Sequence, residues 1–197
     1  MLPATGVVLA GGRSRRMGRD KAFLPGREKT LLEDTLKVLS GLFPEVLLSG
    51  GDPRLAAYGY RVLADEVPDQ GPLGGLCTVL KAAAYDYVFL AACDLPLFSA
   101  AAVSELWLRG RETPGALAFI PKTTGLTHPL HAFYHRDLLP ALEDNLRRGQ
   151  LKMRQVFAAG SPADVLCLAP FTGELAAAIS TNVNTPQEWA AARALFS

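Results

Sequence analysis

A glycine turn followed by a cluster of cations lies near the start of the chain, in VVLAGGRSRRMGRDK at residues 7–21. Gly11 and Gly12 carry no side chains, so backbone N–H groups can approach a phosphate there. Arg16 offers a planar fork of donors and Lys21 a compact point charge. The spacing matches neither the P-loop pattern nor GxGxxG. The alternatives are a plain turn and a solvated or nucleic-acid-binding basic loop, but the glycine turn favours a small phosphorylated ligand.

Two aspartates follow runs that predict buried strands. Asp94 comes after the apolar run YVFLAA, and Asp65 follows YRVLA. A carboxylate in this place can bind Mg²⁺, which prefers one or two carboxylates together with phosphate oxygens. Each aspartate could instead stabilise a turn. The small residues of QGPLGG at 70–75 could lie against a nucleotide base, or could form only a tight turn.

Other catalytic patterns have little support in the sequence. Strand alternation would place His128 and His131 on opposite faces, and no HExxH or cysteine partner accompanies them, so we expect no zinc site. No serine stands in GxSxG, which argues against a hydrolase triad. The three cysteines lack CxxC spacing and predict neither a zinc ribbon nor a redox pair.

These residues must be positioned by short apolar runs that alternate with longer amphipathic ones. The runs predict strands at residues 5–10, 45–49, 60–64, 87–92, 116–120, 130–134 and 163–168. Helices are expected at residues 30–43, 73–84, 99–109, 137–148 and 151–157 and from Pro186 onward, with a helical turn near 54–58.

Strands that alternate with helices predict βαβ units, a mainly parallel sheet and helices on both of its faces. Ligands of such α/β folds bind beyond the carboxyl ends of the strands. The glycine turn, Asp65 and Asp94 all follow such ends. We therefore expect them to share one edge of the sheet.

The bulk composition limits the classes of function. A chain of 197 residues with 49% hydrophobic and 20% charged residues predicts one globular domain, residues 1–197. A net charge of +1 argues against nucleic acid as a partner. The first apolar run is too short for a signal peptide or a spanning helix, and the cysteine count is odd. We expect a cytoplasmic protein without a membrane partner.

Five motifs together resemble those of the molybdenum cofactor guanylyltransferase family. LAGGRSRRMGRDKAFL at residues 9–24 is similar to the family signature LAGGxSxRMGxDKxxL. GPLGG, CDLP, HPL and NVNTP follow in the family's order, beginning at Gly71, Cys93, His128 and Asn182. Related sugar and terpenoid nucleotidyltransferases usually show LAAGxGxRM instead. The resemblance covers nearly the whole chain.

This resemblance implies a fold and a reaction. The fold would be a Rossmann-like nucleotidyltransferase fold, three-layer α/β/α with a mixed, mainly parallel twisted sheet. GTP, with Mg²⁺ as cofactor, would react with Mo-molybdopterin. GMP would be joined to the terminal phosphate of the pterin and pyrophosphate released, which yields molybdopterin guanine dinucleotide. The resemblance also implies transient contacts with proteins that supply molybdopterin or mature molybdoenzymes.

The resemblance also implies roles for individual residues. The catalytic residues would be Arg16, Lys21 and Asp94, with Asp94 as the metal ligand. Asn182 and Asn184 would lie on the molybdopterin side. GTP would be bound by residues at the carboxyl edge of the sheet: Leu9, Ala10, Gly11, Gly12, Lys21, Ser49, Asp65, Gly74 and Asp94.

Two positions depart from the family pattern, and other functions remain open. Asp69 stands where glycine is common, and Ser49 where asparagine often appears. The nearest alternative is a related nucleotidyltransferase that uses CTP with molybdopterin, or an NTP with a sugar phosphate. A non-catalytic GTP-binding or adaptor protein is another alternative, but it should have lost Lys21 or Asp94, and both are present.

Overall fold

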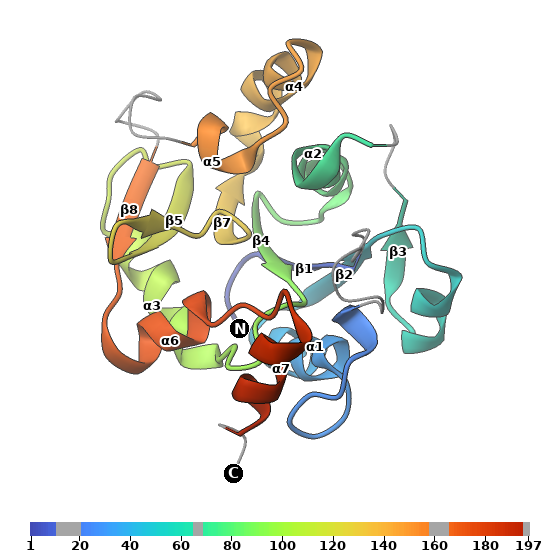
Figure 1. Ribbon diagram of the computed structural model, residues 1–197. Helices are drawn as coiled ribbons and strands as arrows, with labels where there is room; N and C mark the ends of the chain where they lie inside the picture. Colours follow the sequence, from blue (N-terminus) through green and yellow to red (C-terminus); the bar gives the residue numbers. More distant parts are fainter. Residues whose placement is uncertain (11–20, 65–68, 158–165, 195–197) are drawn as a thin grey trace.

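One twisted sheet forms the centre of the molecule in the computed structural model, which describes residues 1–10, 21–64, 69–157 and 166–194 (Figure 1). Within these ranges the strand order is β3-β2-β1-β4-β7-β5-β6, and β8 pairs with β5. The strands are β1 (Thr5–Leu9), β2 (Glu45–Ser49), β3 (Arg61–Leu63), β4 (Tyr87–Ala92), β5 (Ala118–Thr123), β6 (Leu126–Thr127), β7 (His131–His135) and β8 (Leu166–Pro170).

The sheet is mixed, with a parallel half that carries the predicted site. Strands β3, β2, β1 and β4 are parallel, whereas β7 is antiparallel to both β4 and β5. Leu9 at the end of β1 pairs with Ser49 on one side and with Ala92 on the other. The chain therefore leaves β1, β2 and β4 at one edge of the sheet, as predicted.

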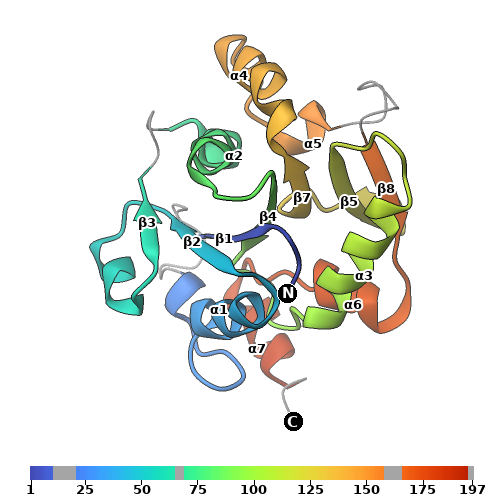
Figure 2. The same cartoon turned by 180° about the vertical axis from the view of Figure 1, so that it is seen from behind.

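Helices cover both faces of the sheet, as Figures 1 and 2 show. Helices α2 (Gly71–Ala82), α4 (Leu139–Arg147) and α5 (Met153–Val156) lie on one side. Helices α1 (Leu31–Leu42), α3 (Ala100–Arg111), α6 (Gly173–Ser180) and α7 (Pro186–Arg193) lie on the other. The short 3₁₀ helices are η1 (Lys21–Phe23), η2 (Pro53–Tyr58) and η3 (Arg136–Leu138). The expected three-layer α/β/α arrangement is confirmed.

Alternation of side chains along the strands builds a separate apolar core on each face. Val7 and Val88 pack toward α2 and α4, whereas their neighbours Val8 and Phe89 pack toward α1 and α3. All four residues are at most 1% exposed. Burial on both faces is the reason that these strands read as continuous apolar runs in the sequence.

Side-chain caps start several of the helices. Ser99, the predicted N-cap of α3, accepts a hydrogen bond from the backbone N of Ala102 at 3.3 Å. Reciprocal capping boxes start α1 and α7, in which Thr30 pairs with Glu33 and Thr185 with Glu188. These caps fix where each helix begins.

Some elements were not predicted, and some predicted bounds differ. Helix α6, the 3₁₀ helix η1 and the two-residue strand β6 are additional to the expected elements. The strand expected at residues 163–168 is β8, and residues 163–165 lie outside the described ranges. In the part of the chain that the structure describes, every helix is too short or too polar to cross a bilayer.

Candidate active site

Lys21 and Asp94 meet at the carboxyl edge of the parallel strands. Lys21 is the first residue of η1, and Asp94 is the second residue after the end of β4. The Lys21 Nζ lies 3.9 Å from Asp94 Oδ2, and the two side chains are 20% and 18% exposed. Two of the three charged groups proposed for catalysis from the sequence therefore face one another.

The segment that begins at Asn182 contacts both members of this pair. Lys21 Nζ donates a hydrogen bond to Asn184 Oδ1 at 2.6 Å. The backbone N of Val183 donates to the carbonyl of Asp94 at 2.9 Å. Asn184, which the resemblance assigns to the molybdopterin side, thus lies against the lysine assigned to GTP.

The Asp94 carboxylate is largely buried, and one of its oxygens accepts no hydrogen bond from the residues that the structure describes. That oxygen is Oδ1, and His131 Nε2 lies 3.7 Å from it, which is beyond hydrogen-bond distance. Burial alone raises the pKa of Asp94, but the facing His131 and Lys21 outweigh it, so that the net pKa lies below the usual value for aspartate. The carboxylate is therefore ionised at neutral pH.

His131 was not among the sequence-predicted site residues. It is 3% exposed and pairs with Ala91 across the antiparallel β7–β4 ladder, which brings it beside Asp94. The expectation that His128 and His131 point to opposite faces was wrong, because His128 lies in the turn before β7, where strand alternation does not apply. Both histidines line one cavity.

The side chains around Asp94 indicate which kind of divalent metal ion the site could bind. Among the described residues, no group of three or more histidine, cysteine, aspartate or glutamate side chains could hold a metal ion. A single carboxylate with an unpartnered buried oxygen fits Mg²⁺, because Mg²⁺ takes most of its other ligands from water and substrate phosphates.

A cavity of about 360 Å³ adjoins Asp94. Its apolar walls include Pro72, Leu130 and Met153, and its cationic side chains are Lys152 and Arg154. Asp94, His128, His131 and Asn182 are its other polar lining residues. Three buried polar atoms without a hydrogen-bond partner belong to lining residues: Asp94 Oδ1, His131 Nδ1 and Asn182 Oδ1. Such atoms are costly in a folded protein unless a ligand or water satisfies them.

The remaining predicted GTP residues lie around the ends of β1 and β2. Ala10 donates its backbone N–H to the carbonyl of Ser49 at 2.8 Å, and Ser49 is 3% exposed. A side chain at Gly50 would lie 3.1 Å from the backbone of Ala10, so glycine lets the two loops approach closely. Ala10, the residue before the glycine turn, is thereby held against the end of β2.

Other predicted residues fall elsewhere. Gly74 is buried within α2, where its missing side chain leaves room for Gln70. Gly11, Gly12, Arg16 and Asp65 lie outside the described residues, so their roles stay predictions.

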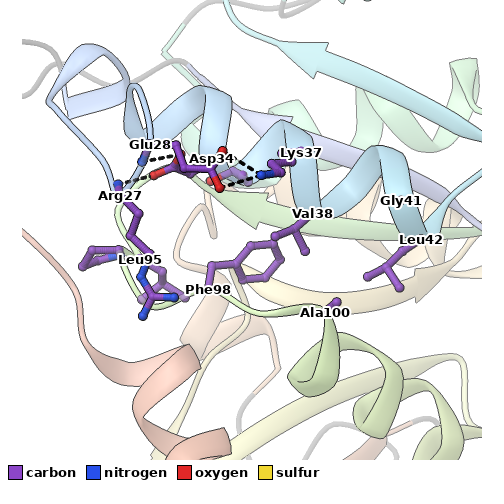
Figure 3. A pocket seen from close by; sticks show the side chains of 12 residues that line it. Arg27, Glu28, Asp34, Lys37, Val38, Gly41, Leu42, Leu95, Phe98 and Ala100 are labelled. Carbon is purple, nitrogen blue, oxygen red and sulfur yellow. Dashed lines mark hydrogen bonds and ion pairs between the residues drawn. The ribbon is translucent and has the colours of Figure 1, made fainter. Parts of the chain in front are cut away.

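A second cavity, of about 380 Å³, lies between α1 and the loop that joins β4 to α3 (Figure 3). Val38, Leu42 and Phe98 supply apolar surface, and a Lys37–Glu28 ion pair lies at its edge. None of the predicted site residues within the described ranges lines it. It is therefore separate from the constellation around Asp94.

Comparison with known proteins gives a consistent result. Residues 6–165 match the family described as the MobA-like NTP transferase domain. A molybdenum cofactor guanylyltransferase of Syntrophotalea carbinolica is 39% identical over 73% of this chain and 68% of its own length. One from Serratia proteamaculans is 33% identical over 93% of this chain and 91% of its own.

A solved structure has the same fold. The molybdopterin-guanine dinucleotide biosynthesis protein A of Archaeoglobus fulgidus superposes with a TM-score of 0.79 at 24% identity, over 97% of each chain. At that identity the likeness concerns the fold.

Proposed function

Because this chain belongs to the MobA-like NTP transferase family, we propose that it transfers GMP from GTP to the terminal phosphate of Mo-molybdopterin. Pyrophosphate leaves, and the product is molybdopterin guanine dinucleotide. The chain is a nucleotidyltransferase by its family, and the choice of GTP and molybdopterin follows the names of its relatives.

The observation that carries the proposal is the Lys21–Asp94 pair, with Asn184 bound to the lysine. Two anionic reactants must meet in this reaction. Unit charges about 4 Å apart repel by roughly 4 kcal/mol at an effective dielectric near 20. A lysine at the phosphates lowers that repulsion and stabilises charge on the departing pyrophosphate.

The chemistry needs no strong general base. The attacking group is a phosphate oxygen that is already anionic at neutral pH. It forms a bond to the α-phosphorus of GTP, and the bond from that phosphorus to the bridging oxygen breaks, so that pyrophosphate leaves with the electron pair. Lys21 and Arg16 would hold the triphosphate in line for this attack, which is the positioning that phosphoryl-transfer enzymes rely on.

Asp94 would hold Mg²⁺. The metal would supply charge neutralisation between the triphosphate and the incoming phosphate. The lowered pKa of Asp94 supports this role, since the carboxylate is ionised at neutral pH and can bind a cation.

The cavity beside Asp94 suits the acceptor. A flat heterocycle can pack against Pro72, Leu130 and Met153, while Lys152 and Arg154 offer charge to its anionic groups. Asn182 would lie there, as the resemblance implies, but Asn184 would act through Lys21 instead. GTP would then occupy the opposite side of Asp94, along residues 9–12, Ser49 and Asp65.

We place the reaction in the cytoplasm. The three cysteines, Cys77, Cys93 and Cys167, are buried thiols, which is compatible with a reducing compartment.

The test is turnover of the purified protein with Mg²⁺, molybdopterin and each of GTP, CTP, ATP and UTP, read as pyrophosphate release. We expect release with GTP and a guanine dinucleotide product. A preference for CTP would show that the protein transfers a cytidylyl group and not a guanylyl group. Turnover that needs a sugar phosphate in place of molybdopterin would contradict the proposal that molybdopterin is the acceptor.

A further inference from the structure

A C-terminal bracket, residues 182–188, joins the two charged groups of the active site. It begins with the NVNTP motif and lies beyond residue 165, where the match to the family model ends. Within it, Asn184 accepts from Lys21 Nζ at 2.6 Å, and the backbone N of Val183 donates to the Asp94 carbonyl at 2.9 Å. Lys21 and Asp94 come from different elements, so the bracket can set their distance.

The bracket itself is held by the first turn of α7. Glu188 Oε2 accepts from the backbone N of Asn184 at 2.6 Å and from that of Thr185 at 3.0 Å. The backbone N of Glu188 donates in return to Thr185 Oγ1 at 3.2 Å. An ordinary capping box ties the glutamate to the N-cap, but here the carboxylate also fixes the residue before it, which is the one that binds Lys21.

A second contact ties α7 to the chain that carries Lys21. Trp189 Nε1 donates to the carbonyl of Pro25 at 3.3 Å. Trp189 of α7 therefore contacts the segment after η1, while Asn184, two residues before α7, contacts Lys21 itself. The two contacts together make α7 and the bracket a support for this part of the site.

We infer that Glu188 is a positioning residue, which acts through Asn184 to hold Lys21 beside Asp94. The inference rests on the proposed function for its kinetic consequence. Glu188 is exposed and contacts neither Lys21 nor Asp94 in the hydrogen bonds and ion pairs described here. Because Asn184 is the residue of the bracket that binds Lys21, we expect the effect of Glu188 on turnover to pass chiefly through Asn184.

The test compares Glu188→Ala with Glu33→Ala. Glu33 closes the matching capping box of α1, where Thr30 is its partner. Both variants lose one cap and should lower Tm by about 2–4 °C. Glu188→Ala should also lower kcat about tenfold, because a displaced group costs rate steeply. Glu33→Ala should keep kcat within about twofold. Equal kcat values in the two variants would overturn the inference.

A double-mutant cycle separates positioning from general destabilisation. If Glu188 acts through Asn184, then Glu188→Ala should leave kcat nearly unchanged in an Asn184→Ala background. Glu188→Gln should restore kcat, since an amide oxygen can accept the same two hydrogen bonds. A full tenfold loss in both backgrounds, or no rescue by glutamine, would contradict the proposed route.

A readout without substrates keeps this inference distinct from the proposed function. Acetylation of Lys21 by acetic anhydride, followed by mass spectrometry, should be faster in Glu188→Ala than in Glu33→Ala, because the lysine loses its fixed partner. Equal labelling rates would overturn the inference. If no nucleotide supports turnover in the unaltered protein, the proposed function fails, whereas the labelling comparison still decides the role of Glu188.

Discussion

An ammonium group and a carboxylate 3.9 Å apart, with an amide oxygen on the ammonium, form the chemical centre of the site. Lys21 is paired, yet it stays 20% exposed and can exchange Asn184 or Asp94 for a phosphate. Asp94 keeps an oxygen free of hydrogen bonds from the described residues. Each residue therefore has capacity left for a ligand.

Replacing Lys21 should separate catalysis from folding. In Lys21→Ala we expect kcat to fall by about 100-fold or more. Removing one preorganised group that stabilises the charge developing in the transition state commonly lowers kcat by that factor. Tm should fall by only a few degrees, because the largely buried Asp94 carboxylate loses one cationic partner but keeps His131 nearby, and this fall is too small to account for the loss of turnover. The measurement is pyrophosphate release together with a thermal melt.

Lys37→Ala is the matched control for Lys21→Ala. It removes another lysine ion pair, that with Glu28, far more exposed than the Lys21 pair. Its turnover should equal that of the unaltered protein. Near-normal turnover of Lys21→Ala would remove this lysine from the mechanism.

The sequence indicated some of these residues and not others. Lys21 and Asp94 could be predicted because each stands at a fixed place after a strand or a glycine turn. His131 could not, because its position beside Asp94 depends on the register of an antiparallel neighbour, β7 against β4. The contact of Asn184 with Lys21 likewise joins distant segments that no local pattern relates.

Among the secondary-structure elements and their connections, the turn before β7 forms one wall of the cavity beside Asp94. It carries His128, Pro129 and Leu130, all of which line the cavity. Tyr134, fully buried on β7, donates its hydroxyl to the carbonyl of Pro129 at 2.6 Å. Complete burial raises the pKa of Tyr134 well above its usual value, so the donor stays protonated.

Removing that hydroxyl should loosen the turn. Tyr134→Phe leaves the Pro129 carbonyl without its donor, which costs about 1–3 kcal/mol of unfolding free energy. We expect weaker acceptor binding, seen as a raised KM for molybdopterin, with the KM for GTP unchanged. Urea unfolding and steady-state kinetics check both effects. A rise in the KM for GTP alone would contradict the assignment of this wall to the acceptor.

Most elements could be predicted from periodicity, and those that could not have local reasons. The strands at 45–49 and 87–92 have the expected bounds because both are apolar and lie between turn residues. Helix α6 was missed because GELAAAIS starts with a glycine at φ 58° and is too short and apolar to show a polar face. Strand β6 has two residues, too few for alternation.

In the molecule as a whole, the proposed site lies where the two apolar cores reach the edge of the sheet. Burial of a histidine there makes the free energy of unfolding depend on pH. Burial, followed by the charges of His131 and Arg154, lowers the pKa of His128 to about 4. An unfolded histidine has a pKa near 6.5. Between these values the unfolded chain binds more protons than the folded one, so the free energy of unfolding falls as the pH drops.

We therefore expect the protein to lose stability between pH 6.5 and pH 4. The loss from His128 is at most about 3 kcal/mol, since one pKa unit corresponds to about 1.36 kcal/mol. Urea unfolding at pH 4.5 and pH 7 measures it. His128→Gln should reduce the difference between the two pH values. An equal difference in both proteins would show that His128 does not carry this dependence.

The layer architecture could be predicted because alternating strands and helices have few stable arrangements. The reversal of β7 could not, because a strand's direction depends on how its connection crosses the sheet, and the sequence does not encode that locally. The shared edge at β1, β2 and β4 followed from the parallel half, which is why the glycine turn and Asp94 were expected to meet there.

The most direct test of the account is a structure of the protein with a non-hydrolysable GTP analogue and Mg²⁺. We predict that the triphosphate lies along residues 9–12 and contacts Lys21, that the metal is bound by Asp94, and that the cavity lined by His131 and Asn182 opens toward the α-phosphate. A triphosphate bound away from this edge of the sheet, or a metal held without Asp94, would contradict it.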